Sequence, residues 1–440
     1  MLNDLGLKRG CFLIFLIAMI EKRFTCVLWL LAVATTSVCQ AENWPMWRGP
    51  RQDGISPERD LPIEWSETEN VAWRLAMPGV APSTPVIWDD KAFITSTDRD
   101  SEDILLICVD TDGIRHWKRR IGRGVSEQED KDNLAAGSPS TDGEHVWTMT
   151  GDGTVTCHDF AGNRTWQFEV EDRYEKIDMP WSMASSPTPY EDLLYIQLLH
   201  LNSSRVIAVD KTTGAEVWNV ERPTDAEGKC LRSYATPIVY RDDQRKYLLT
   251  QGQDYIVAHD LNDGRELWRC GDFHPRSGYD PMMHISSSPV VGPGMILVPA
   301  GNQGNFQVLR PDGIGDVTGD PNYRLWNDYI SPKRPSALLV DSLVYICRES
   351  GVLHCLDAQT GQEHYQRPIH RSTHHASPVY VDNCIYFVAR DGTVTVVKPG
   401  VEFEIVATNK LDDTISASPA VSGGRVYLRG FKALYAIEQQ

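Results

Sequence analysis

Three histidines, His370, His374 and His375, lie within six residues of one another. Neutral imidazole together with a carboxylate such as Asp280 would suit a transition-metal ion. The spacing matches no recognised metal signature, however, and histidines in surface turns commonly bind nothing. Both interpretations stay open from the sequence, and we assign no metal ligand.

A second group of side chains has the composition of a recognition surface. Arg276, Tyr279 and Trp181 combine aromatic and cationic character, which binding interfaces favour. They would suit a sugar, a peptide or a protein loop, and plain loop packing is the alternative. The full set of candidate ligand-binding residues is Asp178, Trp181, His274, Arg276, Tyr279, Asp280, His284, His370, His374 and His375.

Acidic residues and glycines also alternate between Asp312 and Asp320, ahead of Trp326. Carboxylates in a flexible loop are typical of calcium sites. These acids are four residues apart, and they lack the alternating ligands and the closing Glu of an EF-hand. The pattern therefore favours an elongated turn between two strands.

A repeated unit of roughly fifty residues must position all these side chains. Each of eight copies opens with a Ser or Thr beside a Pro, ahead of a short apolar strand, and successive openings are 41 to 54 residues apart. The opening prolines are Pro85, Pro139, Pro187, Pro237, Pro289, Pro335, Pro378 and Pro419. This period is typical of propeller blades. We therefore predict an all-β fold, an eight-bladed propeller with four-stranded antiparallel blades, over residues 69–440.

Inside the clearest copies an Asp, a Gly and a Trp follow at fixed spacing, as in Asp210, Gly214 and Trp218. Because the Asp recurs in blade after blade, it favours a turn-stabilising role over a catalytic one. A large ring at the end of each unit would bridge neighbouring blades and bury apolar area. We expect this docking role for Trp73, Trp117, Trp166, Trp218, Trp268, Trp326 and Tyr365.

Two hairpins of the repeat contain short glycine turns. Asp391-Gly392 is predicted to form a two-residue type I′ turn, and Ser350-Gly351 is expected to connect its strands in the same way. The second prediction would place Cys347 and Cys355 on opposite faces of their sheet. Cysteines two residues before the repeated Asp, such as Cys355, are expected to fill the core.

The eighth copy ends before its outer strand. The segment around Trp73 precedes the first copy and matches the missing strand, so it should complete the last blade and protect the sheet edge.

Residues 1–41 have a basic start, an apolar run and a small-residue end, which predicts a secretory signal cut after Ala41, with Met19 as an alternative start. Neither apolar stretch is long enough to span a bilayer. A lipid anchor at Cys39 is less expected, because Val38 is a poor neighbour for a lipoprotein cysteine. Residues 42–68 would form an N-terminal segment ahead of the propeller, and the protein should be periplasmic or extracellular.

The chain is acidic, with 43 Lys and Arg against 60 Asp and Glu and a formal net charge of −17. This charge disfavours a nucleic-acid partner, since phosphate binding requires clustered cations. We expect a monomer with no transmembrane span.

The repeat resembles the PQQ-like, or quinoprotein-type, β-propeller family, which includes BamB and alcohol dehydrogenases dependent on pyrroloquinoline quinone (PQQ). The resemblance covers residues 83–440 and depends on Asp-x-x-x-Gly-x-x-x-Trp at Asp210 and Asp260, with Tyr365 ending the copy at Asp357. The stretch Trp44–Gly54 is similar to the start of a group of secreted bacterial members.

The resemblance implies two functions. The dehydrogenases hold the quinone with Ca²⁺ and a ring of two adjacent cysteines, whereas this chain has no adjacent cysteines and no Cys-x-x-Cys-His haem motif. We therefore expect an exported scaffold that binds a protein or small ligand on the face of its long blade-to-blade loops, and we assign no cofactor. The alternative is a dehydrogenase for an alcohol or sugar that depends on PQQ and Ca²⁺.

Overall fold

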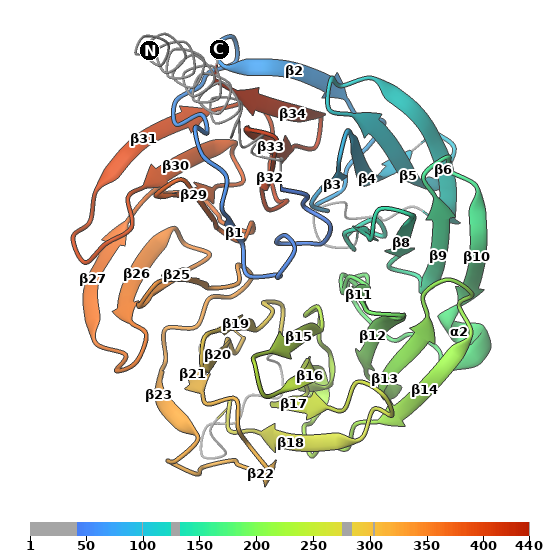
Figure 1. The fold of residues 1–440 in the computed structure, drawn as a ribbon, viewed down its shortest axis with the longest axis vertical. Helices are drawn as coiled ribbons and strands as arrows, with labels where there is room; N and C mark the ends of the chain where they lie inside the picture. The colour runs from blue at the N-terminus through green and yellow to red at the C-terminus, as the bar shows by residue number, and fades with distance from the viewer. Residues whose placement is uncertain (1–41, 99, 125–132, 275–283, 302–303, 440) are drawn as a thin grey trace, which may run out of the picture. The chain divides into compact units, whose positions relative to one another are not determined.

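The computed structural model describes residues 42–98, 100–124, 133–274, 284–301 and 304–439. Within them, eight β-sheets radiate from a central axis, and each blade steps outward by antiparallel hairpins (Figure 1). Six sheets have four strands, and two gain a short fifth strand. The predicted eight-bladed, four-stranded propeller is confirmed.

Blades 1 to 4 follow the chain from the innermost to the outermost strand. Blade 1 contains β3 (Val86–Trp88), β4 (Lys91–Asp98), β5 (Asp103–Asp110) and β6 (Arg115–Arg123), and blade 2 contains β7 (Ser140–Thr141), β8 (His145–Met149), β9 (Thr154–Asp159) and β10 (Arg164–Glu169). Blade 3 contains β11 (Thr188–Tyr190), β12 (Leu193–His200), β13 (Ser203–Asp210) and β14 (Glu216–Glu221), and blade 4 contains β15 (Ile238–Arg241), β16 (Lys246–Gly252), β17 (Tyr255–His259) and β18 (Glu266–Cys270). Two short helical turns, α2 (Val170–Arg173) and η1 (Gly228–Leu231), lie in the connections after blades 2 and 3.

Blades 5 to 8 complete the ring. Blade 5 contains β19 (Val290–Gly292), β20 (Met295–Val298), β21 (Phe306–Leu309) and β23 (Arg324–Asp328), and blade 6 contains β24 (Leu338–Val340), β25 (Leu343–Cys347), β26 (Val352–Asp357) and β27 (Glu363–Pro368). Blade 7 contains β28 (Val379–Val381), β29 (Cys384–Val388), β30 (Thr393–Val397) and β31 (Ile405–Lys410), and blade 8 contains β32 (Ala420–Ser422), β33 (Arg425–Arg429), β34 (Ala433–Glu438) and β2 (Val71–Ala76). The fifth strands are β22 (Gly315–Asp316) on blade 4 and β1 (Ile55–Ser56) on blade 7.

Blade 8 is built from both ends of the chain. Strand β2 pairs antiparallel with β34, with Trp73 opposite Ala436 and Arg74 opposite Tyr435. The predicted closure is therefore confirmed. Because an N-terminal strand occupies the outer edge of the C-terminal sheet, the ring cannot open without breaking a sheet.

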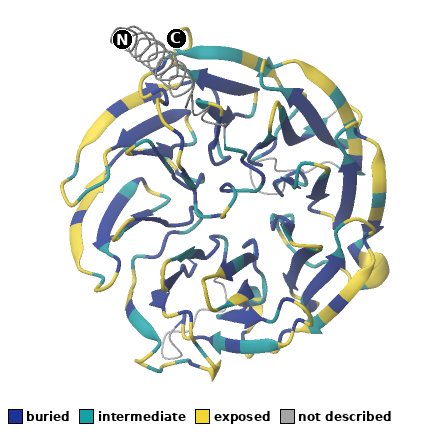
Figure 2. Cartoon of the chain, viewed as in Figure 1, coloured by how far each residue is buried: buried dark blue, intermediate teal, exposed yellow. Residues whose placement is uncertain are grey.

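The core lies in the inner and middle strands (Figure 2). All five residues of β29 are buried, whereas β31, on the outside of the same blade, alternates between exposed and buried positions. Middle strands are covered by the neighbouring blades on both faces, so they are almost continuously buried, as β9 and β30 are, and the outer strands keep a solvent face.

Each docking Trp ring lies against a glycine in a turn of the next blade, whereas Tyr365 packs on Phe403 with ring centroids 5.4 Å apart. A Cβ added to Gly214 would lie 2.7 Å from Trp166, and one added to Gly361 would lie 2.7 Å from Trp326. Indole N–H groups reach the same turns, as in the 3.1 Å bond from Trp166 Nε1 to the Lys211 carbonyl oxygen. The Asp of the turn accepts backbone N–H groups, with Asp210 Oδ1 2.8 Å from Thr213 N, which confirms its turn-stabilising role.

The two glycine hairpins differ from the prediction. Strand β29 ends at Val388 and β30 begins at Thr393, so Asp391-Gly392 belongs to a four-residue turn in which only Gly392 has positive φ. The turn before Val352 is likewise longer, and it pairs Cys347 with Leu353 and Cys355 with Tyr345. The predicted opposite placement of the two cysteines was wrong, because type I′ geometry needs two left-handed residues and each turn supplies one.

The cysteines of the described residues are all buried free thiols. Burial raises the pKa of Cys108 and Cys157 to about 12, so both remain protonated at neutral pH. Buried thiols of this kind pack as small apolar side chains.

The acidic run from Asp312 to Asp320 forms the connection between β21 and β23. Its strand β22 pairs in parallel with β18 of blade 4. Asp316 Oδ1 accepts from Thr318 N at 2.9 Å, and Asp320 Oδ1 accepts from Asn322 N at 2.9 Å. These carboxylates stabilise the turn, and the predicted elongated loop is confirmed.

The N-terminal segment 42–68 crosses the axis of the propeller (Figure 1). The guanidinium of fully buried Arg48 donates to the Ala337 carbonyl oxygen of blade 6 at 2.8 Å. The Gln52 amide donates to Thr188 Oγ1 of blade 3 at 3.3 Å, and β1 pairs with β28 of blade 7. The segment therefore joins distant blades at the centre of the ring, a role that its sequence motif did not reveal.

Candidate functional site: the funnel of the long-loop face

A cavity of about 510 Å³ opens at the axis on the face that carries the blade-to-blade connections. All eight connections contribute to its wall, and Trp47 of the N-terminal segment also lines it. The lining residues are Trp47, Pro82, Asn133, Ala136, Ser138, Trp181, Ser182, Ala184, Ser186, Tyr234, Thr236, His284, Ser286, Ser288, Lys333, Arg334, His375, Ser377, Ser416, Ser418 and Phe431. We call this cavity the long-loop funnel.

A ring of hydroxyl groups forms the inner wall of the funnel. From blade 1 to blade 7, the Ser or Thr of the blade opening donates its backbone N–H to the side-chain oxygen of the equivalent residue in the next blade. The bonds, each 2.9 to 3.1 Å, run from Thr84 to Ser138, Ser186, Thr236, Ser288, Ser336, Ser377 and Ser418. A buried N–H without an acceptor is costly, which gives the hydroxyl of the Ser/Thr-Pro signature a physical reason.

The residue two positions before each of these hydroxyls faces the funnel. In five blades this residue is Pro, Ala or Ser, all small and uncharged: Pro82, Ala136, Ala184, Ser286 and Ser416. In the other three blades it is Tyr234, Arg334 or His375. One structurally repeated position therefore differs sharply in chemistry around the ring.

Aromatic side chains gather on one side of the funnel. The rings of Trp181 and His284 have centroids 5.0 Å apart, and those of Tyr234 and His284 are 5.4 Å apart at a steep angle. The three residues come from three successive connections. Such tilted ring pairs stabilise one another, so the three rings form one aromatic wall of the funnel.

Cationic side chains gather on the other side, around Glu349. Lys333 Nζ lies 2.9 Å, Arg334 Nη1 3.5 Å and His375 Nε2 3.2 Å from the Glu349 carboxylate. Burial acts to raise the pKa of Glu349, but the hydrogen bonds from His375 and Lys333 outweigh it and lower the pKa to about 2. Burial also lowers the pKa of His375. Two permanent cations thus face one carboxylate, and this wall has a net positive charge.

The structure brings three of the predicted site residues together in the funnel: Trp181, His284 and His375. Asp178 instead forms an ion pair with Arg232, 2.8 Å from Oδ1 to Nη2. His274 is buried, with Nδ1 2.9 Å from Asp254 Oδ1. Neither residue lines the funnel.

The three neighbouring histidines have separate partners. His370 Nε2 is 2.9 Å from Asp391, whereas His375 contacts Glu349. The side chain of His374 is buried, with Nδ1 3.0 Å from the Ser372 carbonyl oxygen, and burial lowers its pKa to about 4. The three imidazoles therefore do not converge on one point.

Arg276, Tyr279 and Asp280 lie outside the described residues. Tyr234, Lys333 and Arg334 also line the funnel, and they were not among the predicted site residues. A signal was present, because every lining residue of the repeated position stands two residues before the Ser or Thr of the opening. Strand-like alternation ahead of each opening would have pointed to Tyr234 and Arg334, whereas Lys333 lies three residues before Ser336.

The funnel offers a poor fit to a calcium-bound quinone. Ca²⁺ takes six to eight oxygen ligands, typically including carboxylates, and no carboxylate occurs among the described residues that line the funnel. Groups of three or more side chains suited to hold a metal ion are also absent from the described part of the chain.

The fold defines this protein as an eight-bladed propeller of the quinone-like repeat class. The chain belongs to the family whose model is described as outer membrane protein assembly factor BamB, which matches residues 101–312 and 315–401. No curated protein matches the sequence. Among the described residues, no helix is long and apolar enough to cross a membrane.

Solved structures with the same fold include a BamB protein and two dehydrogenases. BamB from Moraxella catarrhalis is 14% identical with a TM-score of 0.62, over 84% of this chain and 97% of that one. The quinohemoprotein alcohol dehydrogenase of Comamonas testosteroni is 13% identical with a TM-score of 0.68, over 90% and 81%. A europium-containing methanol dehydrogenase is 11% identical with a TM-score of 0.64, over 90% of each chain. These identities relate the folds and leave the activity open.

Proposed function

We propose that this protein is an exported binding scaffold, and that a partner protein or small ligand occupies the long-loop funnel. The divergence of the repeated lining position carries the proposal. Eight similar blades place eight equivalent lining positions around the funnel. A specific partner can be recognised only if the side chains at these positions differ. Tyr234, Arg334 and His375 supply that difference, while the small residues of the other blades leave the funnel open.

The walls of the funnel suggest what the partner presents. Lys333 and Arg334 exceed the charge of Glu349, so an acidic group is favoured on that side. Trp181 and His284 on the opposite side favour a ring or another flat apolar surface. Concave sites with a few oriented polar groups are typical of ligand binding.

Export is part of the same proposal. It is supported by the signal-like composition of residues 1–41 and by the family description, which names outer membrane protein assembly.

Site-specific photo-crosslinking in envelope preparations tests the scaffold role. The crosslinker p-benzoylphenylalanine at Ser416, which lines the funnel, is compared with the same group at exposed Val217 on the outer strand β14. We expect one defined adduct from Ser416 that disappears in the Arg334→Gln, His375→Gln double variant. The same adducts from both positions, or an adduct unaffected by the double variant, would contradict the proposal.

A dehydrogenase dependent on PQQ and Ca²⁺ is the second candidate, favoured by the similarity in fold to the two dehydrogenases. Adding quinone to residues 42–440 with and without Ca²⁺ separates the candidates. A rise in melting temperature together with dye-linked alcohol oxidation would establish the enzyme and displace the scaffold. Binding of the quinone without oxidation of the alcohol would leave the scaffold proposal in place.

A further inference from the structure

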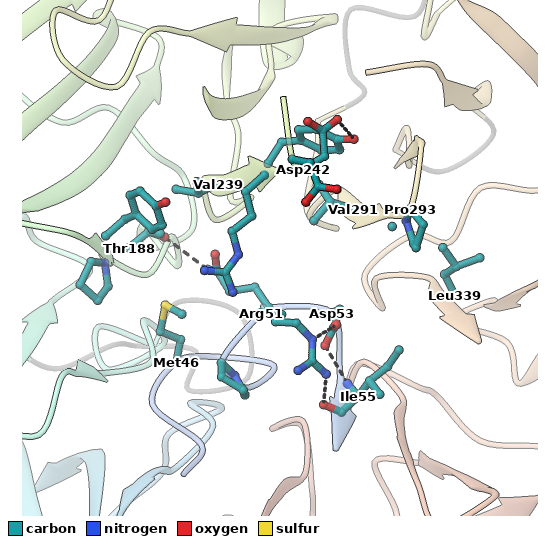
Figure 3. A pocket seen from close by; sticks show the side chains of 18 of the residues that line it. Met46, Arg51, Asp53, Ile55, Thr188, Val239, Asp242, Val291, Pro293 and Leu339 are labelled. Carbon is teal, nitrogen blue, oxygen red and sulfur yellow. Dashed lines mark hydrogen bonds and ion pairs between the residues drawn. The ribbon is translucent and has the colours of Figure 1, made fainter. Parts of the chain in front are cut away.

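A second cavity, of about 590 Å³, is lined by innermost strands and the turns that follow them, so it opens on the face opposite the blade-to-blade connections. Figure 3 shows this cavity from close by. Its wall combines the N-terminal segment with the innermost strands of blades 3 to 6 and the turns that follow those strands. No residue lines both this cavity and the long-loop funnel. We call it the short-turn cavity.

The body of the short-turn cavity is apolar. Met46 and Ile55 of the N-terminal segment face Val239, Val291 and Leu339 of the innermost strands (Figure 3). The Gln52 side chain in the same wall is fixed by its bonds to Thr188 Oγ1 and the Pro237 carbonyl oxygen. A preformed apolar wall of this kind favours insertion of an apolar side chain.

The mouth of the cavity lies within a ring of carboxylates. The eight turns that join the innermost strand of each blade to the second strand contain ten acidic residues and one basic residue, Arg245. The acidic residues are Asp89, Asp90, Asp142, Glu144, Glu191, Asp192, Asp242, Asp243, Asp341 and Asp382. Part of the net charge of the chain is therefore concentrated around this opening.

Turn geometry does not require these charges. Glu191 has a φ of 50° and Asp341 a φ of 52°, a region that Gly and Asn also adopt. The equivalent turn of blade 5 uses Pro293-Gly294, and that of blade 8 uses Gly423-Gly424. Uncharged residues thus serve the same hairpins within this chain.

Some of the carboxylates are neutralised by neighbours. Five of the ten form ion pairs: Asp90 with Lys91 at 2.7 Å, Asp142 with Lys211 at 2.9 Å, Glu191 with Lys246 at 2.8 Å, Asp242 with Arg245 at 3.1 Å and Asp382 with Arg59 at 3.5 Å. Asp243 and Asp341, which line the cavity, form no ion pair or side-chain hydrogen bond with another described residue. Arg241 is the unpaired cation of the lining, since Arg51 bonds Asp53 at 2.8 Å. The lining therefore keeps an excess of free negative charge.

We infer that the short-turn cavity binds a basic peptide segment of a partner protein, with one apolar side chain in the cavity and cationic side chains over the surrounding turns. Charge complementarity selects a cation. The acidic turns extend over six blades, well beyond the cavity, so an extended ligand can reach charges that a small one cannot. The apolar wall distinguishes a peptide from a simple polyamine.

Fluorescence anisotropy of the protein without residues 1–41 tests this inference. The probe is a labelled peptide of alternating Lys and Leu, compared with its Lys/Ser and Glu/Leu analogues. The Asp243→Asn, Asp341→Asn double variant removes two charges from the lining. The matched control, Asp112→Asn with Glu402→Gln, removes two exposed charges from turns between third and fourth strands, which lie on the same face outside the ring of carboxylates.

We expect the lining variant to weaken binding of the Lys/Leu peptide about tenfold and the control variant to weaken it much less. Val291→Thr keeps the shape of the side chain but places a hydroxyl in the apolar wall, so it should weaken binding of the Lys/Leu peptide and leave binding of the Lys/Ser peptide unchanged. An equal loss of affinity in the lining and control variants would show that the peptide is held only by diffuse electrostatic attraction, and it would overturn the proposed site. Displacement of the probe by spermine as readily as by unlabelled peptide would overturn the peptide class.

Discussion

The indole Nε1 of Trp73 donates a 2.7 Å hydrogen bond to the backbone carbonyl oxygen of Thr111. Trp73 belongs to β2 of blade 8, and Thr111 lies in the turn after β5 of blade 1. One side chain of the N-terminal strand thus joins the first and last blades. The same contact recurs between other neighbouring blades, so the ring is held by a repeated junction as well as by its closing strand.

Replacing Trp73 tests the weight of this junction. Trp73→Ala should lower the free energy of unfolding by about 2–4 kcal/mol, because it removes a partly buried ring and leaves space against Gly113. Trp73→Phe keeps a ring and loses the N–H donor, so it should cost about 1 kcal/mol. Urea unfolding measures both. Equal stability of the alanine variant and the wild type would show that the junction contributes nothing to closure.

Two glycines with similar backbone conformations separate strain from packing. Gly113 and Gly294 both have positive φ, but an added Cβ would lie 2.7 Å from the Trp73 ring at Gly113 and would meet nothing within 4 Å at Gly294. Gly294→Ala should cost about 1–2 kcal/mol from backbone strain alone. Gly113→Ala should cost clearly more, because the ring must also move. Similar losses in thermal unfolding would contradict the docked geometry.

The hydroxyl ring of the funnel can be tested at Thr236. Its Oγ1 accepts the Ser186 N–H at 3.1 Å. Thr236→Val keeps the shape and leaves that buried donor unpaired, so it should destabilise the protein by about 1–3 kcal/mol. Thr236→Ser retains the acceptor and should recover most of the loss in chemical denaturation. A valine variant as stable as the serine variant would show that the hydroxyl ring does not stabilise the protein.

Buried histidines make stability depend on pH. His259 Nδ1 is 3.0 Å from the Gly264 carbonyl oxygen, so Nδ1 carries a proton, and Nε2 is 3.0 Å from Thr250 Oγ1. Burial lowers its pKa to about 4. The unfolded chain takes up this proton near pH 6.5, so the free energy of unfolding should fall as the pH decreases from about 6.5 to 4. His259→Asn should reduce this slope in urea titrations, and an unchanged slope would contradict the assignment.

Glu349 contributes in a more acidic window. Its pKa of about 2 lies below the value of the unfolded chain, so its stabilising effect is present above about pH 4.5 and is lost as the pH falls toward 2. Glu349→Gln should remove this part of the acid sensitivity and leave the part due to His259 unchanged. Loss of the His259-dependent slope in this variant would show that the two effects are coupled.

The period of the repeat was enough to predict the number of blades and the closure by the segment around Trp73. Both depend on local patterns: an alternating apolar strand, a turn and a terminal ring define one blade, and a missing outer strand identifies its complement. Turn lengths at Asp391-Gly392 and Ser350-Gly351 were predicted less well. A single Gly permits positive φ without specifying whether two or four residues form the hairpin.

The sequence by itself determined the propeller, its blade order and the chemistry of the loops, because these follow from short-range pattern. Only the tertiary structure decided which loop residues meet. It brought Trp181, His284 and His375 into the long-loop funnel with Tyr234 and Arg334, and it gave His370 and His374 other partners. It also placed Arg48 and Gln52 at the axis. Residues from different blades converge through the curvature of the closed ring, and no local sequence pattern encodes that convergence.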